Sequence, residues 1–115
     1  MVTQCFKRIF IAGHIGKFVK LAGGIFNTHS KVADARLEVL TACAVIAGEE
    51  RTTLEKIVGS NTTEEAVGYI RSPEVWKAVG DRALKYLRER TYGEIEIDIA
   101  FFSFEEGRLY ESEGR

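Results

Sequence analysis

The stretch IFIAGHIGKFVKLAGGIFNTHS, residues 9 to 30, decides the fold expected for this chain. It opens on four consecutive apolar residues, which predict a short strand over Lys7–Ala12, buried on both faces. Gly13 is expected to end this strand. Apolar residues then recur at spacings of three and four, which predicts a helix over Lys17–Ile25. The stretch therefore predicts a strand, a glycine turn and a helix in close succession.

Further helices are expected in the middle of the chain. A continuous apolar stripe predicts one over Val32–Ala47, and two shorter ones should cover Thr52–Val58 and Thr63–Arg71. Asn61-x-x-Glu64 and Thr62-x-x-Glu65 are alternative capping boxes for the last of these helices. The sequence leaves the choice between the two boxes open.

The last third of the chain predicts a long helix and two strands. Ser72-Pro73 places a serine at the N-cap and a proline at the first helical position, and Gly93 ends the helix. Strict alternation of polar and apolar residues predicts a strand over Glu94–Ile99, which nearby phenylalanines prolong. A turn then leads into a final strand over Arg108–Glu111.

This order of elements predicts a single α/β domain over residues 1–115. We expect a small sheet with helices packed on it, a buried first strand and a C-terminal strand pair. Such a sheet is thin, since sheets usually hold about 4–6 strands. Either elements that the pattern does not reveal complete the sheet, or the chain is part of something larger.

Composition excludes several classes of protein. With 45% hydrophobic and 29% charged residues the chain is globular, and its net charge of −1 argues against nucleic-acid binding. No stretch approaches the roughly 20 apolar residues of a membrane span. Cys5 and Cys43 match no zinc or redox spacing, which favours two reduced thiols. We expect a cytoplasmic protein that meets any anionic ligand with a local cluster of cations.

The glycine turn after the first strand does not match a nucleotide-binding motif. Gly13 and Gly16-Lys17 enclose two residues where a P-loop needs four, and Phe18 replaces the magnesium-binding serine or threonine. The Rossmann fingerprint also fails, because His14-Ile15 stand where its second glycine is required. A glycine turn at a helix N-terminus remains, and its free N–H groups favour an anion.

Polar side chains gather around this turn. Lys17 and Lys20 are three residues apart, so they project from one side of the predicted helix and are suited to clamp a carboxylate or phosphate. His14 and His29 have no Cys, Asp or Glu at metal-ligand spacing, so we expect no metal. At the next helix, Asp34 and Glu38 share one edge while Arg36 points away, so these three residues are not expected to form one flat patch.

The sequence from Gly13 to Lys17, from Val19 to Ser30 and from Ala33 to Glu38 closely resembles the CbiD family, the cobalt-precorrin-5B C1-methyltransferases of the anaerobic cobalamin pathway. The resemblance implies transfer of a methyl group from S-adenosylmethionine to ring carbon C1 of a corrinoid. It further implies that substrate or cofactor is bound by residues of this stretch: Gly13, His14, Gly16, Lys17, Lys20, Asn27, Thr28, His29, Ser30, Asp34, Arg36 and Glu38.

Family members are considerably longer, so this chain resembles only their C-terminal part. Two hypotheses follow: the C-terminal part of such an enzyme, or a non-catalytic module that binds an anionic ligand or a partner protein. Partners would be a corrinoid, together with an N-terminal domain or subunit, or a second copy of the chain. In either case we expect Gly13–Lys17 and Asn27–Ser30 to face one cleft at the carboxyl end of the first strand.

Overall fold

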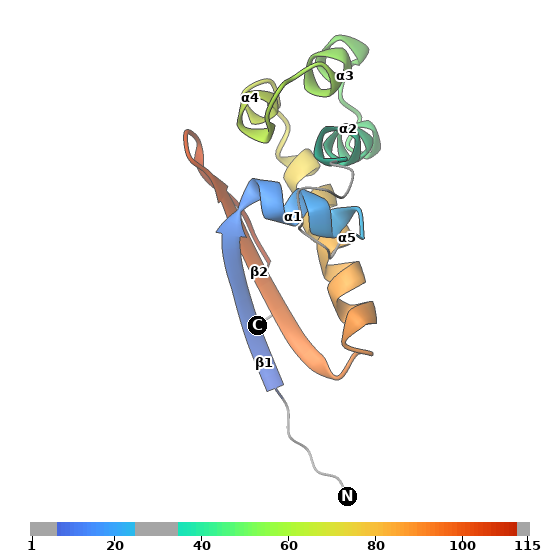
Figure 1. Ribbon diagram of the computed structural model, residues 1–115, viewed down its shortest axis with the longest axis vertical. Helices are drawn as coiled ribbons and strands as arrows, with labels where there is room; N and C mark the ends of the chain where they lie inside the picture. Colours follow the sequence, from blue (N-terminus) through green and yellow to red (C-terminus); the bar gives the residue numbers. More distant parts are fainter. Residues whose placement is uncertain (1–6, 25–34, 113–115) are drawn as a thin grey trace, which may run out of the picture.

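The computed structural model describes residues 7–24 and 35–112, and this part of the chain forms three strands and five helices. Figure 1 shows the sheet with the helices gathered over one of its faces and beyond one of its ends. In chain order the elements are β1 (Lys7–His14), α1 (Ile15–Ala22), α2 (Arg36–Ile46), α3 (Arg51–Val58), α4 (Thr63–Val67), α5 (Pro73–Arg90), β2 (Ile95–Ser103) and β3 (Gly107–Glu111).

The sheet has the order β1-β2-β3. β1 pairs with β2 in parallel, in a register that runs from Lys7 opposite Ile95 to His14 opposite Phe102. β3 returns antiparallel to β2 and forms the expected C-terminal strand pair, with a bulge between Phe101 and Phe102. All five helices therefore lie in the single connection between β1 and β2, and the α/β class expected from the sequence is confirmed.

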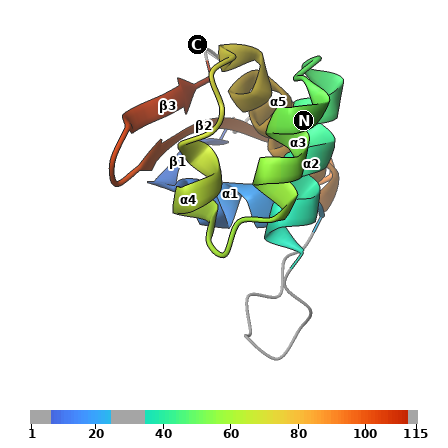
Figure 2. The ribbon, with the colours of Figure 1, turned by 90° about the horizontal axis from the view of Figure 1, so that it is seen from above.

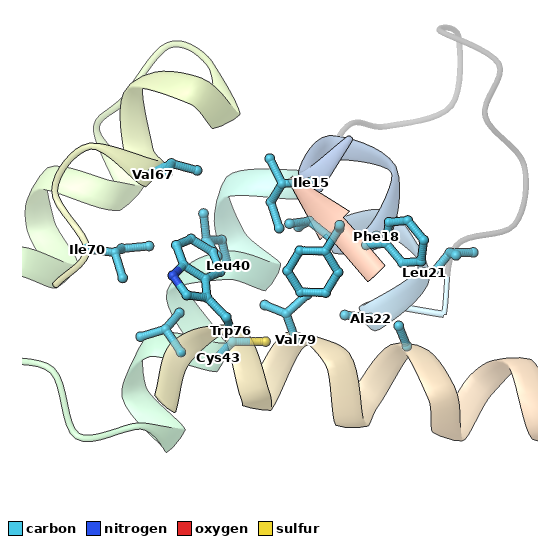
Figure 3. Packing of buried hydrophobic residues seen from close by; sticks show 14 of the residues in the cluster. Ile15, Phe18, Leu21, Ala22, Leu40, Cys43, Val67, Ile70, Trp76 and Val79 are labelled. Atoms are coloured by element: carbon cyan, nitrogen blue, oxygen red, sulfur yellow. The ribbon is translucent and has the colours of Figure 1, made fainter. Parts of the chain in front are cut away.

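The core lies between α5, the sheet and the shorter helices. Apolar residues at helical spacing on α5 place Trp76, Val79 and Ala83 on its buried side. Phe101 of β2 reaches this layer from the sheet, and its ring centroid lies 5.3 Å from that of Phe18 on α1. Figure 3 shows Phe18, Trp76 and Val79 packed together with Leu40 and Cys43 of α2. The core thus fixes α1 against the sheet and α2 against α1 and α5.

Several boundaries differ from those expected, each for a local reason. β1 continues through Gly13 to His14, so no glycine loop separates it from α1. α1 ends at Ala22 because Gly24, with φ of +78°, turns the chain out of the helix. α4 stops at Val67 instead of reaching Arg71, since Gly68 follows it. The expected start of the second helix, residues 32–34, lies outside the described residues.

Burial of β1 varies along the strand. Ile11 is half-buried, whereas Ile9 and Phe10 are 41% and 56% exposed. An all-apolar strand is expected to be covered on both faces, but in the described part of the chain β1 is paired only on its β2 side. These two side chains are consequently left at an open edge of the sheet.

Candidate functional site

His14 stands at the carboxyl end of β1 and caps α1. Its backbone is extended, and Nδ1 accepts a hydrogen bond of 3.0 Å from the Gly16 N–H. Because Nδ1 accepts, we assign the ring proton to Nε2, which lies 2.6 Å from Oε2 of Glu64. Both nitrogens of the ring are therefore occupied, and the imidazole is held in one orientation.

Glu64 joins three segments of the chain. Its Oε2 accepts from His14 and, at 2.6 Å, from the backbone N–H of Phe104 just beyond β2. Burial alone would raise the pKa of Glu64, but the hydrogen bonds from the Phe104 N–H and from His14 outweigh it and hold the pKa below its ordinary value. The Phe104 ring stacks on the His14 ring at 4.4 Å. Figure 2 shows α4 beside α1 at this end of β1.

The capping box that forms explains why Glu64 is available. Thr62 accepts from the Glu65 N–H, and the Glu65 carboxylate accepts from the Asn61 N–H. The Thr62-x-x-Glu65 alternative is therefore the one used, which leaves Glu64 to face His14. Sequence reasoning missed Glu64 and Phe104 as site residues, and the unused second capping box was the only signal for Glu64.

A cationic depression of about 330 Å³ adjoins this cluster. Its walls are Gly16, Lys17, Lys20 and Arg36, so it brings together four of the residues expected to bind ligand. Lys17 is exposed and Lys20 half-buried on α1, and Arg36 is the first residue of α2. A Cβ on Gly16 would lie 3.3 Å from both Arg36 Nη1 and His14 Nδ1, so the glycine admits the guanidinium beside the His14 ring.

Arg36 also lines a second depression, of about 230 Å³, with Glu38 and the chain at Asn61–Thr63. The sequence predicted that Asp34, Arg36 and Glu38 would not form one flat patch, and this stays a prediction because Asp34 lies outside the described residues. Arg36 and Glu38 line the same depression, which side chains from both sides of a helical turn can do. Arg36 therefore lies between the two depressions and belongs to both.

The remaining expected site residues divide into two groups. Gly13 lies within β1, where an added Cβ would only reach ordinary contact with Phe18 at 3.4 Å. Outside the described residues are Asn27, Thr28, His29, Ser30 and Asp34. A cleft shared by Gly13–Lys17 and Asn27–Ser30 stays a prediction.

Two classes of site find no support in the part of the chain that the structure describes. No group of three His, Cys, Asp or Glu side chains there is arranged to hold a metal ion. Residues 7–24 and 35–112 also contain no helix that is long and apolar enough to cross a membrane.

The chain thus has an α/β fold, and the His14–Glu64 contact and the cationic depression lie near the carboxyl end of its two parallel strands. The family described as "CbiD, C-terminal domain" matches residues 27–113, and the chain belongs to this family. It is 44% identical over 108 residues to a cobalt-precorrin-5B C(1)-methyltransferase of Fusobacterium nucleatum and 47% identical over 111 residues to one of Alkaliphilus metalliredigens. No solved structure matches.

The chain covers only part of these relatives. Each of the two alignments includes 94% of this chain and 29% of the relative. A third relative of the same name, from Clostridioides difficile, is 41% identical over 115 residues, with 94% of this chain and 28% of the relative covered. The chain therefore spans less than a third of the length of the relatives it matches.

Proposed function

We propose that this chain is the C-terminal part of an enzyme that methylates cobalt-precorrin-5B at ring carbon C1. Its contribution is to bind carboxylate groups of the corrinoid in the depression formed by Lys17, Lys20 and Arg36. The observation that carries the proposal is the convergence of these three cations from two helices beside the N-terminus of α1. Guanidinium and ammonium groups are strong partners for carboxylates, and a helix N-terminus adds to their attraction.

The charge of the depression favours the corrinoid over the methyl donor as its ligand. S-adenosylmethionine would supply the methyl group as an electrophile attached to a sulfonium, and it carries a single carboxylate. Three clustered cations repel a sulfonium, whereas a corrinoid with several acetate and propionate groups gains from each of them. We therefore assign Lys17, Lys20 and Arg36 to binding of the substrate. The methyl donor would be bound by residues outside this depression.

Methyl transfer depends more on the alignment of the two reactants than on a catalytic base. An in-line displacement at a methyl group needs the accepting carbon held at the correct distance and angle. His14 has both ring nitrogens engaged, by Gly16 and Glu64, so its role would be to hold the start of α1 in place beneath Lys17. We infer a positioning role for His14 rather than proton transfer.

A calorimetric titration of the chain with a polycarboxylate corrinoid tests the proposal. Wild type should bind, and Lys17→Ala and Lys20→Ala should each weaken binding without unfolding the chain, because surface changes usually stay within about 0.5 kcal/mol of stability. Lys85→Ala, an exposed lysine on α5, is the matched control and should bind as wild type does. Equal affinity in all four proteins would contradict the proposal.

The chain alone would bind without turning over. It spans less than a third of the length of the relatives it matches, so methyl transfer would require the remaining part of the enzyme. Detectable turnover by the chain alone would show that the whole site lies within it. A non-catalytic binding module is the alternative function, and turnover that stays absent when the remaining part is supplied would favour it. A cytoplasmic location is part of this proposal.

A further inference from the structure

β1 is an edge strand with apolar side chains exposed on both faces of the sheet. Successive residues of a strand point to opposite faces, so Ile9 and Phe10 cannot be covered by a single layer on one side. Ile9 lies on the face toward the helices, yet α5 packs against β2 and β3, and Ile9 remains 41% exposed. An element that covers both side chains has to lie beside β1, in the plane of the sheet.

The opposite edge of the sheet is protected in a way that β1 is not. β3 is five residues long, carries exposed Arg108 and Glu111, and has an irregular register, since Tyr110 and Arg108 stand opposite the successive residues Phe101 and Phe102. All three features discourage a further strand. β1 is eight residues long and continues its regular register with β2 without a bulge. From Ile9 to His14 it has neither a proline nor a lysine or arginine. The outer edge of β1 thus has the features of a pairing surface.

The face of the sheet opposite to α5 continues this surface. The register places Phe10 and Ala12 in line with Asp98 and Ala100 of β2 on that face, and His14 follows at its end, where Glu64 of α4 reaches the His14 ring. Phe102 is 38% exposed there. Arg8 pairs with Glu96 and Asp98 at the other end, so charges bound the apolar strip.

The comparisons indicate what pairs with β1. The match to the family's C-terminal domain begins at residue 27, so β1 and α1 precede the matched residues, whereas the alignments with the longer relatives include 94% of this chain and so reach into β1. β1 therefore precedes the residues matched by the C-terminal domain, although it pairs with β2, which lies within them. We propose that a strand from that preceding part pairs with the outer edge of β1 and extends the sheet.

Hydrogen exchange can test this pairing. The pairing rests on the proposed function in one respect: its partner strand comes from the remaining polypeptide of the relatives. The probes are this chain alone and the intact Fusobacterium nucleatum relative. Alternate amides of β1 that do not bond to β2 should exchange at least about 100-fold more slowly in the intact relative than in this chain. The β1 amides that bond to β2 should be protected in both proteins and serve as the internal control.

Matched substitutions sharpen the comparison. In the intact relative, glutamate at the position aligned with Ile9 should abolish the added protection, while glutamate at the position aligned with Ile46, which is 63% exposed on α2, should leave it unchanged. Equal, fast exchange of the outward amides in the chain and in the intact relative would overturn the proposal. So would a dimer of this chain by light scattering with the same amides protected, because a second copy would then be the occupant. Corrinoid titration of the chain does not involve this edge, so failure of either proposal is recognised separately.

Discussion

His14 and Glu64 lie fifty residues apart in the sequence, and their side chains meet at 2.6 Å across the carboxyl end of β1. The same imidazole caps α1, and the same carboxylate binds the chain that follows β2. A single contact thus fixes the end of the first strand, the start of α1 and the start of α4 relative to one another. Lys17 and Arg36 line the depression beside this framework.

Replacing His14 should separate its two roles. His14→Ala removes both the cap and the Glu64 contact and should lower the free energy of unfolding by about 2–4 kcal/mol. His14→Asn restores a cap oxygen for the Gly16 N–H but cannot form the same contact with Glu64, so it should lose about half as much. Urea unfolding measures both variants, and equal losses would show that the cap contributes nothing.

The Glu64 carboxylate should make stability depend on pH in the acid range. Its pKa in the folded chain lies below the ordinary value of 4.5, so the ionised group stabilises the fold above that pH. This contribution is lost as the pH falls through the folded-state pKa. Glu64→Gln should therefore be less stable than wild type near neutrality, with a difference that shrinks on acidification.

Unfolding curves of wild type and Glu64→Gln at several pH values measure this difference. The same pair in a His14→Asn background shows how much of the difference depends on the contact between Glu64 and His14. A difference that stays constant from neutral to acid pH would rule out the proposed contribution of the ionised carboxylate.

Gly80 should tolerate no side chain, although it lies within α5. Alanine in a helix interior usually stabilises by about 1 kcal/mol relative to glycine. Here an added Cβ would overlap Cε2 of Tyr110, whose ring stacks on Phe101. Gly80→Ala should therefore destabilise the chain by about 1–3 kcal/mol. In a Tyr110→Ala background the same change should become neutral or stabilising, and a double-mutant cycle without coupling would disprove the contact.

The Cys43 thiol should be inert in the folded chain. It is fully buried between α2 and the core, and burial raises its pKa to about 11 despite the opposing charge of Arg82. Almost no thiolate then exists at neutral pH. In a Cys5→Ser background, an aromatic disulfide reagent should react with Cys43 only in denaturant, and rapid reaction in buffer would contradict its burial.

The order and type of the elements could be predicted from the sequence because local patterns determine them. Alternation over Glu94–Ile99 and the Ser72-Pro73 start gave β2 and α5 nearly at their observed bounds. The predictions erred where one side chain decides a boundary. His14 belongs to the strand and caps the helix directly after it, so the expected glycine loop does not exist.

The candidate site was predictable only in part. Lys17 and Lys20 could be paired by helical spacing alone, but their meeting with Arg36 depends on how α2 packs against α1. The His14–Glu64 contact joins the end of β1 to α4, fifty residues further along the chain, and cannot be read from spacing. Both contacts depend on tertiary packing, which local sequence patterns do not reveal.

Chemical-shift mapping by nuclear magnetic resonance tests the central claim most directly, since it identifies the residues that a ligand contacts. On titration with a polycarboxylate corrinoid, the largest shifts should fall on Gly16, Lys17, Lys20 and Arg36. The depression of about 270 Å³ lined by Arg88, Gly93 and Ile95–Ile97 is of similar size and serves as the control. We predict that its resonances stay in place. Shifts concentrated there, with Gly16 and Lys17 unmoved at saturation, would contradict the account.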